Sequence, residues 1–279
     1  MVLGIVGLGL IGGSLGLAAR SAGHFEMLLG SDHNPEHARI ALKRGIVDEI
    51  VSWETLKSRC DIIVLAVPVG AIIALLKELE GIGPETTVID MGSTKTTIAQ
   101  AVPPAFRSRF VAAHPMAGTE FAGPQAALAT LYRDKVAVLC DLEASAPLQH
   151  SRARMLFESI GMRIVTMDAK AHDRHAAFIS HLPHVISYSL ANSVLGQEDK
   201  ASILTLAAGG FRDMSRLAKS PAVLWRDIFH HNQSALLDAI AVFEKELSQA
   251  KSLIQNGEWE ALTQFMECAN TLHELFDPR

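Results

Sequence analysis

Residues 2–15 read VLGIVGLGLIGGSL, and this stretch decides the fold of the chain. An apolar run ends at Gly7 and an apolar, helix-compatible segment follows Gly12, so a G-x-G-x-x-G pattern joins a strand to a helix. Gly7 permits the tight turn, Gly9 lets the backbone approach a pyrophosphate, and Gly12 lets the helix pack closely on the strand. N–H groups at the start of the helix then face the phosphates of a dinucleotide. The dinucleotide is also expected to contact Leu8, Leu10 and Ile11 in this turn.

An acidic residue is expected about 20 positions beyond such a turn. Residues 27–31 form a second apolar run, and Asp32 ends it. A carboxylate at this point accepts hydrogen bonds from both ribose hydroxyls of NAD and repels the 2′-phosphate of NADP. Because no arginine follows Asp32 directly, we expect the cofactor to be NAD and not NADP. The alternative is that Asp32 is an incidental carboxylate on the surface.

The composition is that of a globular protein with two domains. The 279 residues are 49% hydrophobic and 20% charged, and the net charge of −5 offers no basic field for nucleic acid. The three cysteines, Cys60, Cys140 and Cys268, lie far apart, which argues against a disulfide framework, and the first two are expected to be buried thiols. No signal peptide and no apolar stretch of about 18 residues is evident, so we expect a cytoplasmic protein that does not enter a membrane.

Strands and helices alternate over the first part of the chain. This alternation predicts a Rossmann-type, doubly wound, mostly parallel α/β sheet. Strands are expected at 27–31, 61–67, 86–90, 110–113, 135–139 and 163–167, and helices at 35–44, 69–79 and 153–159, with another helix beginning at 93–95.

After residue 167 the strand-like runs stop and amphipathic helices follow. Asp168 is expected to cap a helix that runs towards Ser193 with a kink at Pro183, and 205–216 is expected to form a bend. Ser220 precedes a proline as the N-cap of the next helix, and Asn256-Gly257 separates the last two helices. We therefore predict a dinucleotide-binding domain at 1–167 and an all-helical domain at 168–279.

Four polar segments follow predicted strands or interrupt the helical half. They read DMGSTK (90–95), HPMAGTE (114–120), SHLP (180–183) and GGFRDMSR (209–216). Together with GLGLIGGS (7–14) and WRDI (225–228), they resemble the prephenate/arogenate dehydrogenase family in the family's order. The resemblance implies NAD-dependent oxidative decarboxylation of prephenate to 4-hydroxyphenylpyruvate in tyrosine biosynthesis. Arogenate, which would give tyrosine directly, is the alternative substrate, and the helical domain is expected to form a homodimer.

The resemblance also implies roles for individual residues. His114 matches the catalytic histidine, and a neutral imidazole suits removal of a hydroxyl proton near neutral pH. Ser93 matches the serine that orients this histidine and the substrate hydroxyl, and it is also placed to cap a helix. Lys95 is expected to be a solvated residue of the first helical turn.

Cations are needed for the carboxylates of the substrate. Arg216 matches the arginine that clamps the ring carboxylate, and Arg212 is a supporting cation or a partner of a surface ion pair. His181 matches a substrate-binding histidine, although a polar helix surface is its alternative. Glu120 beside an anion could orient water or an arginine, or favour the amino group of arogenate. Further pocket positions are Thr119, Ser220 and Trp225, and Val67 and Pro68 are expected at the cofactor.

Other functions fit the sequence less well. The i,i+3 pairs His172/His175 and His181/His184 lack the carboxylates or thiols that would complete a metal site, so no metal is expected. A β-hydroxyacid dehydrogenase or imine reductase would use a lysine on the interdomain helix, where this chain has Lys170 and then histidines. A non-catalytic NAD sensor remains an alternative from another class. Leu236, Ile240, Phe243 and Leu247 form an apolar row that suits a domain core or a dimer.

Overall fold

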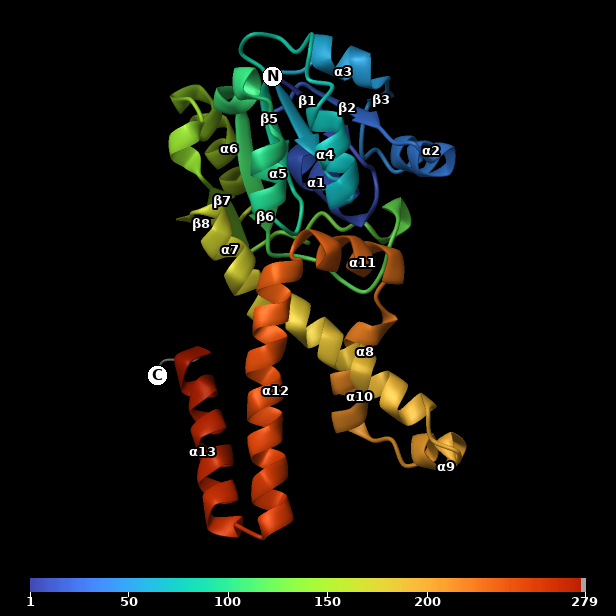
Figure 1. The fold of residues 1–279 in the computed structure, drawn as a ribbon. Helices are drawn as coiled ribbons and strands as arrows, with labels where there is room; N and C mark the ends of the chain where they lie inside the picture. Colours follow the sequence, from blue (N-terminus) through green and yellow to red (C-terminus); the bar gives the residue numbers. More distant parts are fainter. Residues whose placement is uncertain (277–279) are drawn as a thin grey trace. The chain divides into compact units, whose positions relative to one another are not determined.

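The computed structural model describes residues 1–276, and its centre is an eight-stranded sheet (Figure 1). The strand order is β3-β2-β1-β4-β5-β6-β7-β8, and every neighbouring pair is parallel except β6 with β7. The carboxyl ends of β1, β4, β5 and β6 therefore meet at one edge, as the sequence predicted. The strands are β1 (Val2–Val6), β2 (Met27–Ser31), β3 (Glu49–Ile50), β4 (Ile62–Leu65), β5 (Thr87–Asp90), β6 (Phe110–Pro115), β7 (Val136–Cys140) and β8 (Arg163–Met167).

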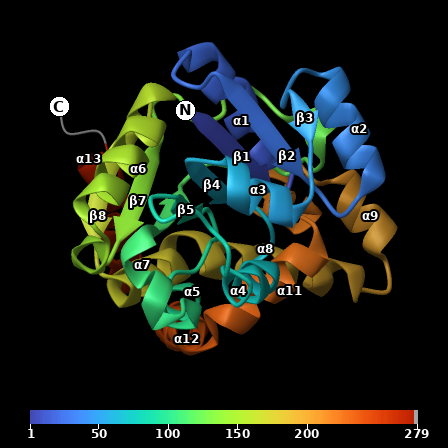
Figure 2. The ribbon, with the colours of Figure 1, turned by 90° about the horizontal axis from the view of Figure 1, so that it is seen from above.

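Helices cover both faces of the sheet, and each face has its own hydrophobic core (Figure 2). Alternate residues of a strand point to opposite faces, so Leu3 and Ile5 enter one core and Val6 the other. The first core receives α1 (Leu10–Ala22), α2 (Pro35–Lys43) and α6 (Pro147–Ser159). The second receives α3 (Trp53–Arg59), α4 (Val69–Leu76), α5 (Thr96–Ala101) and α7 (Ala169–Ala176). Short 3₁₀ turns occur at Pro104–Arg109, Pro124–Ala126 and Leu142–Ala144.

The helical segments that follow β8 differ from the prediction in several places. The Asp168 side chain accepts a hydrogen bond from Ala171 N at 2.8 Å and caps α7, as expected. Instead of a simple kink at Pro183, a π-helical turn at Ala177–His181 separates α7 from α8 (Leu182–Leu195). The distortion lies just before the proline, whose missing N–H and bulky ring oppose a regular turn there.

Two helices occupy the region where a bend was expected. They are α9 (Lys200–Thr205) and α10 (Gly209–Ser215), which is followed by a 3₁₀ turn at Arg216–Lys219. Helix α11 (Ala222–His231) has Pro221 at its N-cap, so the predicted capping role of Ser220 is wrong by one position. Other boundaries also moved. Helix α6 starts six residues earlier than predicted, at Pro147, α4 ends at Leu76, and β6 continues through His114 and Pro115.

The chain divides into two compact units, Met1–Gln233 and Ser234–Arg279. The second unit contains most of α12 (Gln233–Asn256) and all of α13 (Trp259–Phe276), which are separated at Gly257 as predicted. Gly257 has a φ of 70°, a conformation that ends helices and favours glycine. Within the described residues, every helix is too short or too polar to cross a bilayer.

Candidate active site

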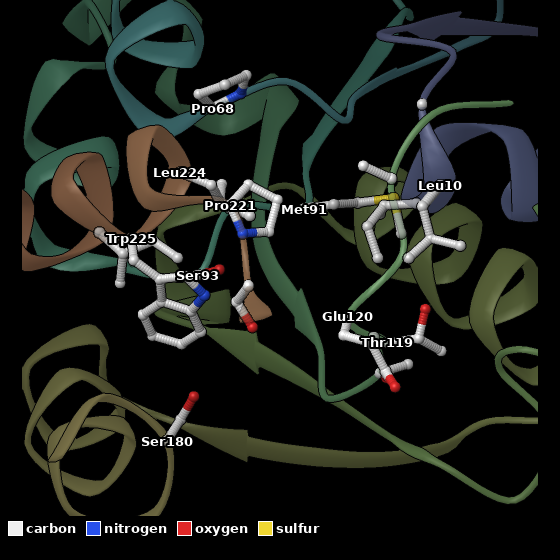
Figure 3. A pocket seen from close by; sticks show the side chains of 18 of the residues that line it. Leu10, Pro68, Met91, Ser93, Thr119, Glu120, Ser180, Pro221, Leu224 and Trp225 are labelled. Atoms are coloured by element: carbon white, nitrogen blue, oxygen red, sulfur yellow. The ribbon is translucent and has the colours of Figure 1, made fainter. Parts of the chain in front are cut away.

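A cavity of about 740 Å³ lies at the carboxyl ends of the central strands (Figure 3). Figure 3 shows Leu224 and Trp225 of α11 on one side and Thr119 and Glu120 of the loop after β6 on the other. Of the residues expected at the site, those that line the cavity are Gly9, Leu10, Ile11, Val67, Pro68, Ser93, His114, Thr119, Glu120, Arg216, Ser220 and Trp225. Those that do not are Gly7, Leu8, Gly12, Asp32, His181 and Arg212.

The three glycines of the first turn serve different purposes. Gly7 has a φ of +88°, and a Cβ on it would lie 2.5 Å from the carbonyl oxygen of Ala66. A Cβ on Gly12 would lie 1.9 Å from the carbonyl oxygen of Gly7. A Cβ on Gly9 would meet nothing within 4 Å, although Gly9 lines the cavity. Gly7 and Gly12 are therefore required by the fold, while the bare backbone at Gly9 leaves room for a ligand.

The carboxylate of Asp32 is oriented by the backbone around it. It accepts a hydrogen bond from Leu8 N at 2.7 Å, which joins the end of β2 to the glycine turn, and a local one from Asn34 N at 2.8 Å. The Nδ1 atoms of His33 and His37 each lie 3.5 Å from one of its oxygens. The sequence predicted the carboxylate but not these two imidazoles.

The loop that carries Thr119 and Glu120 is fastened to the start of α1. The hydroxyl of the fully buried Tyr132 donates to Ile11 O at 2.6 Å, and Leu128 N donates to Ser14 Oγ at 2.9 Å. These bonds hold the loop next to the glycine turn, so its lining residues face the same cavity as Gly9.

His114 lies near the end of β6 and begins a chain of hydrogen bonds that leads away from the cavity. Its Nδ1 lies 2.8 Å from His172 Nε2, and His172 Nδ1 lies 2.9 Å from Asp173 Oδ1. Burial, together with His172, Lys95 and His181 nearby, holds the pKa of His114 well below its ordinary value of 6.5. The imidazole is therefore neutral at neutral pH.

Asp173 also caps the helix that follows Ser93. Lys95 N and Thr96 N donate to its two carboxylate oxygens at 2.7 Å and 2.8 Å. The predicted capping role of Ser93 is wrong, because α5 begins only at Thr96 and its first N–H groups are satisfied from α7. Ser93 lines the cavity instead. Burial raises the pKa of Asp173, but hydrogen bonds from His172, Thr96 and Lys95 outweigh it and leave that pKa below the ordinary range.

Lys95 is fully buried, so its expected solvation is wrong. Its ammonium binds the carboxylate of Asp90 and donates to Ala113 O at 2.6 Å. Asp90 also accepts hydrogen bonds from Gly92 N at 2.9 Å and Ala113 N at 3.1 Å. This network joins the end of β5 to the residue that precedes His114.

The histidines of the SHLPH segment have different positions. His181 is fully buried, does not line the cavity, and accepts a hydrogen bond at Nδ1 from Asn232 Nδ2 at 3.0 Å. His184 does line the cavity, where its ring stacks on Trp225 with centroids 3.3 Å apart. His184 was not among the predicted site residues, although it lies one helical turn after Ser180, another lining residue. Burial lowers the pKa of His181 to about 4 and also lowers that of His184.

Arg216 is the guanidinium that reaches the cavity. Its Nη1 lies 3.9 Å from Glu120 Oε2, and 53% of its side chain is exposed. The carboxylate of Glu120 thus lies beside the guanidinium of Arg216, an arrangement compatible with the expectation that Glu120 orients an arginine. Arg212 is exposed and lies outside the cavity lining.

Two protein-family models match the chain. "Prephenate dehydrogenase, nucleotide-binding domain" matches residues 15–166, and "Prephenate dehydrogenase, dimerization domain" matches residues 168–268. The chain belongs to the prephenate dehydrogenase family. The prephenate dehydrogenase of Lactococcus lactis is 32% identical over 94% of this chain and 74% of its own length.

Two solved structures extend the comparison. Prephenate dehydrogenase from Aquifex aeolicus, solved with hydroxyphenyl propionate and NAD⁺, aligns over 99% of this chain and 98% of its own, with a TM-score of 0.93 and 30% identity. Arogenate dehydrogenase from Synechocystis aligns over 99% and 100%, with a TM-score of 0.83 and 32% identity. Family membership thus includes relatives named for either substrate.

Proposed function

We propose that this chain catalyses the NAD-dependent oxidative decarboxylation of prephenate to 4-hydroxyphenylpyruvate. The observation that carries the proposal is that Gly9, His114 and Arg216 line one cavity, and they supply a dinucleotide site, a base and a carboxylate clamp. Membership of the prephenate dehydrogenase family supports the reaction class.

The cofactor is NAD, and the residues of the first two strands fit it. The open space beside Gly9 admits a pyrophosphate, and the start of α1 supplies N–H groups without an acidic residue in its first turn. We propose that Asp32 accepts the ribose hydroxyls and excludes NADP, with Val67 and Pro68 lining the path to the reacting ring. When bound, NAD⁺ accepts the hydride that leaves C4 of the substrate.

His114 handles the proton in this scheme. As the hydride leaves, the 4-hydroxyl gives its proton to His114, and a dienone remains. Loss of CO₂ from the ring then sends an electron pair into the carbonyl, and the resulting phenolate takes the proton back. The neutral state of His114 at neutral pH suits the first of these transfers.

The remaining lining residues orient the substrate. Arg216 can take the ring carboxylate through two parallel N–H bonds, and Ser93 can bond the 4-hydroxyl beside His114. Trp225 and His184 supply a stacked aromatic wall for the ring. His181 and Arg212 do not line the cavity of the single chain, and this argues against their expected contacts with the substrate.

The test is NADH formation by the purified protein, with NAD⁺ and either prephenate or arogenate as the second substrate. Turnover of prephenate with a higher kcat/KM supports the proposal, and preference for arogenate assigns the alternative. Glu120 favours a trial of arogenate, because a lining carboxylate can bind its ammonium group. His114→Asn serves as the matched inactive variant. Failure with both substrates, while NAD⁺ still binds, would reject the function.

We also propose a functional boundary at residue 167 and a homodimer formed by the C-terminal helices. The match of a dimerization-domain model to residues 168–268 supports both. On α12 and α13, Leu247, Trp259 and Leu272 are more than half exposed in the single chain, which suits burial against a second copy. Light scattering after gel filtration tests the dimer, and a monomeric mass would reject it.

A further inference from the structure

We infer that His172 and Asp173 form a relay with His114 that fixes the tautomer of His114 and leaves the lone pair of its Nε2 facing the cavity. The inference deepens the proposed function, since it concerns the base of that reaction. Both relay residues are buried, on α7, and neither lines the cavity.

The hydrogen-bond directions follow from Asp173. An ionised carboxylate only accepts, so His172 Nδ1, 2.9 Å away, must carry a hydrogen. The relay requires the neutral form of His172, in which the lone pair is on Nε2 and faces His114 Nδ1 at 2.8 Å. His114 Nδ1 must therefore donate, and its own lone pair is on Nε2. Among the described residues Nε2 of His114 has no hydrogen-bond partner, so it is available to a substrate proton.

Asp173 is itself held in place by the segment that carries Ser93. Lys95 N and Thr96 N donate to its two oxygens, and Asn232 Nδ2 donates to its backbone carbonyl at 2.8 Å. One carboxylate thus connects the start of α5 with the imidazole at the end of β6. The position of the base and the position of the Ser93 loop are set by the same group.

The relay also supplies a negative charge that stabilises His114 when it takes up a proton. The groups that face His114 are His172 from α7, His181 from the π-helical turn and the ammonium of Lys95 from the segment before α5. None of these supplies a negative charge, and the carboxylate of Asp90 is bound to Lys95. When His114 becomes an imidazolium, the carboxylate of Asp173, reached through His172, is the charge that stabilises it.

Asp173→Asn tests the tautomer directly. When the amide nitrogen takes the place of Oδ1, the bond from Lys95 N is lost and the amide donates to His172 Nδ1. Both hydrogen bonds of the relay are then reversed, and the hydrogen of His114 is placed on Nε2. In a Ser-His-Asp triad the same substitution lowers kcat about 10⁴-fold. We expect a fall in kcat of about 10²–10⁴-fold, with the KM for substrate and the Kd for NAD⁺ changed by less than about threefold. Asp48→Asn is the matched control, because Asp48 also accepts hydrogen bonds from a backbone N–H and an arginine but lies directly before β3 and outside the cavity lining.

Two further readouts separate a relay from a merely structural role. In Asp173→Asn, loss of the carboxylate that stabilises the His114 imidazolium should shift the acid limb of kcat/KM to lower pH. Partial unfolding would lower the rate without shifting the limb. His172→Leu should lose about as much kcat as Asp173→Asn, the double variant should lose no more than either, and His172→Gln should recover part of the loss. Additive losses, or an unmoved limb, would overturn the relay.

A measurement without turnover keeps the relay distinct from the proposed function. Long-range ¹H–¹⁵N spectra of histidine-labelled protein report the tautomer of His114, whose signals are assigned by their loss in His114→Asn. We expect Nδ1–H in the native protein and Nε2–H in Asp173→Asn. An Nε2–H tautomer in the native protein would overturn the inference even if prephenate is turned over. A protein inactive on both substrates but with the expected tautomer would reject only the function.

Discussion

The ammonium of Lys95 binds the carboxylate of Asp90, and both side chains are completely buried. The pair lies between the end of β5 and the end of β6, where Lys95 also donates to Ala113 O. A buried ion pair contributes little relative to apolar packing, but loss of one partner leaves the other charge uncompensated. The pair therefore holds the strand that carries His114 in position, and its removal has a large cost.

Lys95→Met should lower the free energy of unfolding by about 3–5 kcal/mol, because it leaves the Asp90 carboxylate buried without its cation. Denaturant unfolding checks this value. Lys77→Met is the control, since Lys77 is exposed at the end of α4 and its loss should change stability by less than about 0.5 kcal/mol. Equal effects of the two substitutions would contradict a structural role for the buried pair.

The glycines of the first turn give a second prediction. Gly12→Ala should cost more than about 3 kcal/mol of stability, because its Cβ would overlap the carbonyl oxygen of Gly7. Gly9→Ala should leave stability within about 1 kcal/mol, since Gly9 has a φ of −71° and open space around it. The Kd for NAD⁺ should nevertheless rise at least about tenfold in Gly9→Ala. Thermal unfolding and titration with NAD⁺ separate the two effects, and normal NAD⁺ affinity would place the pyrophosphate elsewhere.

The sheet was predictable because its signals are local. An apolar run that ends at a glycine, a proline or an aspartate marks a buried parallel strand, and the G-x-G-x-x-G turn fixes the first crossover. The helices after β8 were less predictable. Gly209 and Gly210 suggested a bend, yet they are the first residues of α10, because glycine is tolerated in a first helical turn. The local sequence does not show the tertiary contacts that stabilise such a helix.

Within the site, the sequence identified residues but not their partners. His114, Ser93 and Arg216 could be found from motifs, and all three line the cavity. His172 and Asp173 contribute to no strong motif, since their contacts with His114 and Lys95 span 58 and 78 residues. Lys95 was misjudged for the same reason, because burial of a lysine depends on a carboxylate and carbonyls supplied by other strands.

Arg216→Ala should chiefly weaken substrate binding. Loss of a charged hydrogen bond costs about 1.5–3 kcal/mol, or roughly 10- to 150-fold in KM. Arg212→Ala is the informative comparison, because Arg212 is exposed and lies outside the lining. Steady-state kinetics with the preferred substrate should show the larger rise in KM for Arg216→Ala. A larger rise for Arg212→Ala would assign the clamp to Arg212.

Stability should fall as the pH is lowered below about 6.5. The pKa of buried His181 is lowered from 6.5 to about 4, and those of His114 and His184 are also lowered. Below pH 6.5 the unfolded chain therefore binds more protons than the folded chain does. Stability that is present above pH 6.5 is lost as the pH falls towards the folded-state pKa values of these histidines. For His181 alone the loss amounts to about 3 kcal/mol.

The variant His181→Gln tests this assignment. The glutamine can still accept from Asn232, and the slope of unfolding free energy against pH should decrease between pH 6.5 and 4, by at most about 1.4 kcal/mol per pH unit. His24→Gln, at an exposed position, should leave the slope unchanged. An unchanged slope in His181→Gln would mean that His181 is not a source of the acid sensitivity.

The acid limb of kcat/KM should lie below pH 6.5. Burial, together with His172, Lys95 and His181 nearby, holds the pKa of His114 low, so the base stays neutral, and the rate stays on its plateau, at pH values where an ordinary histidine is already protonated. His114→Asn should lower kcat about 10²–10⁴-fold and remove this limb, with binding of NAD⁺ retained. His24→Asn should change neither quantity. A limb that persists at the same pH in His114→Asn would show that another group takes the proton, and it would remove both the base and the relay behind it.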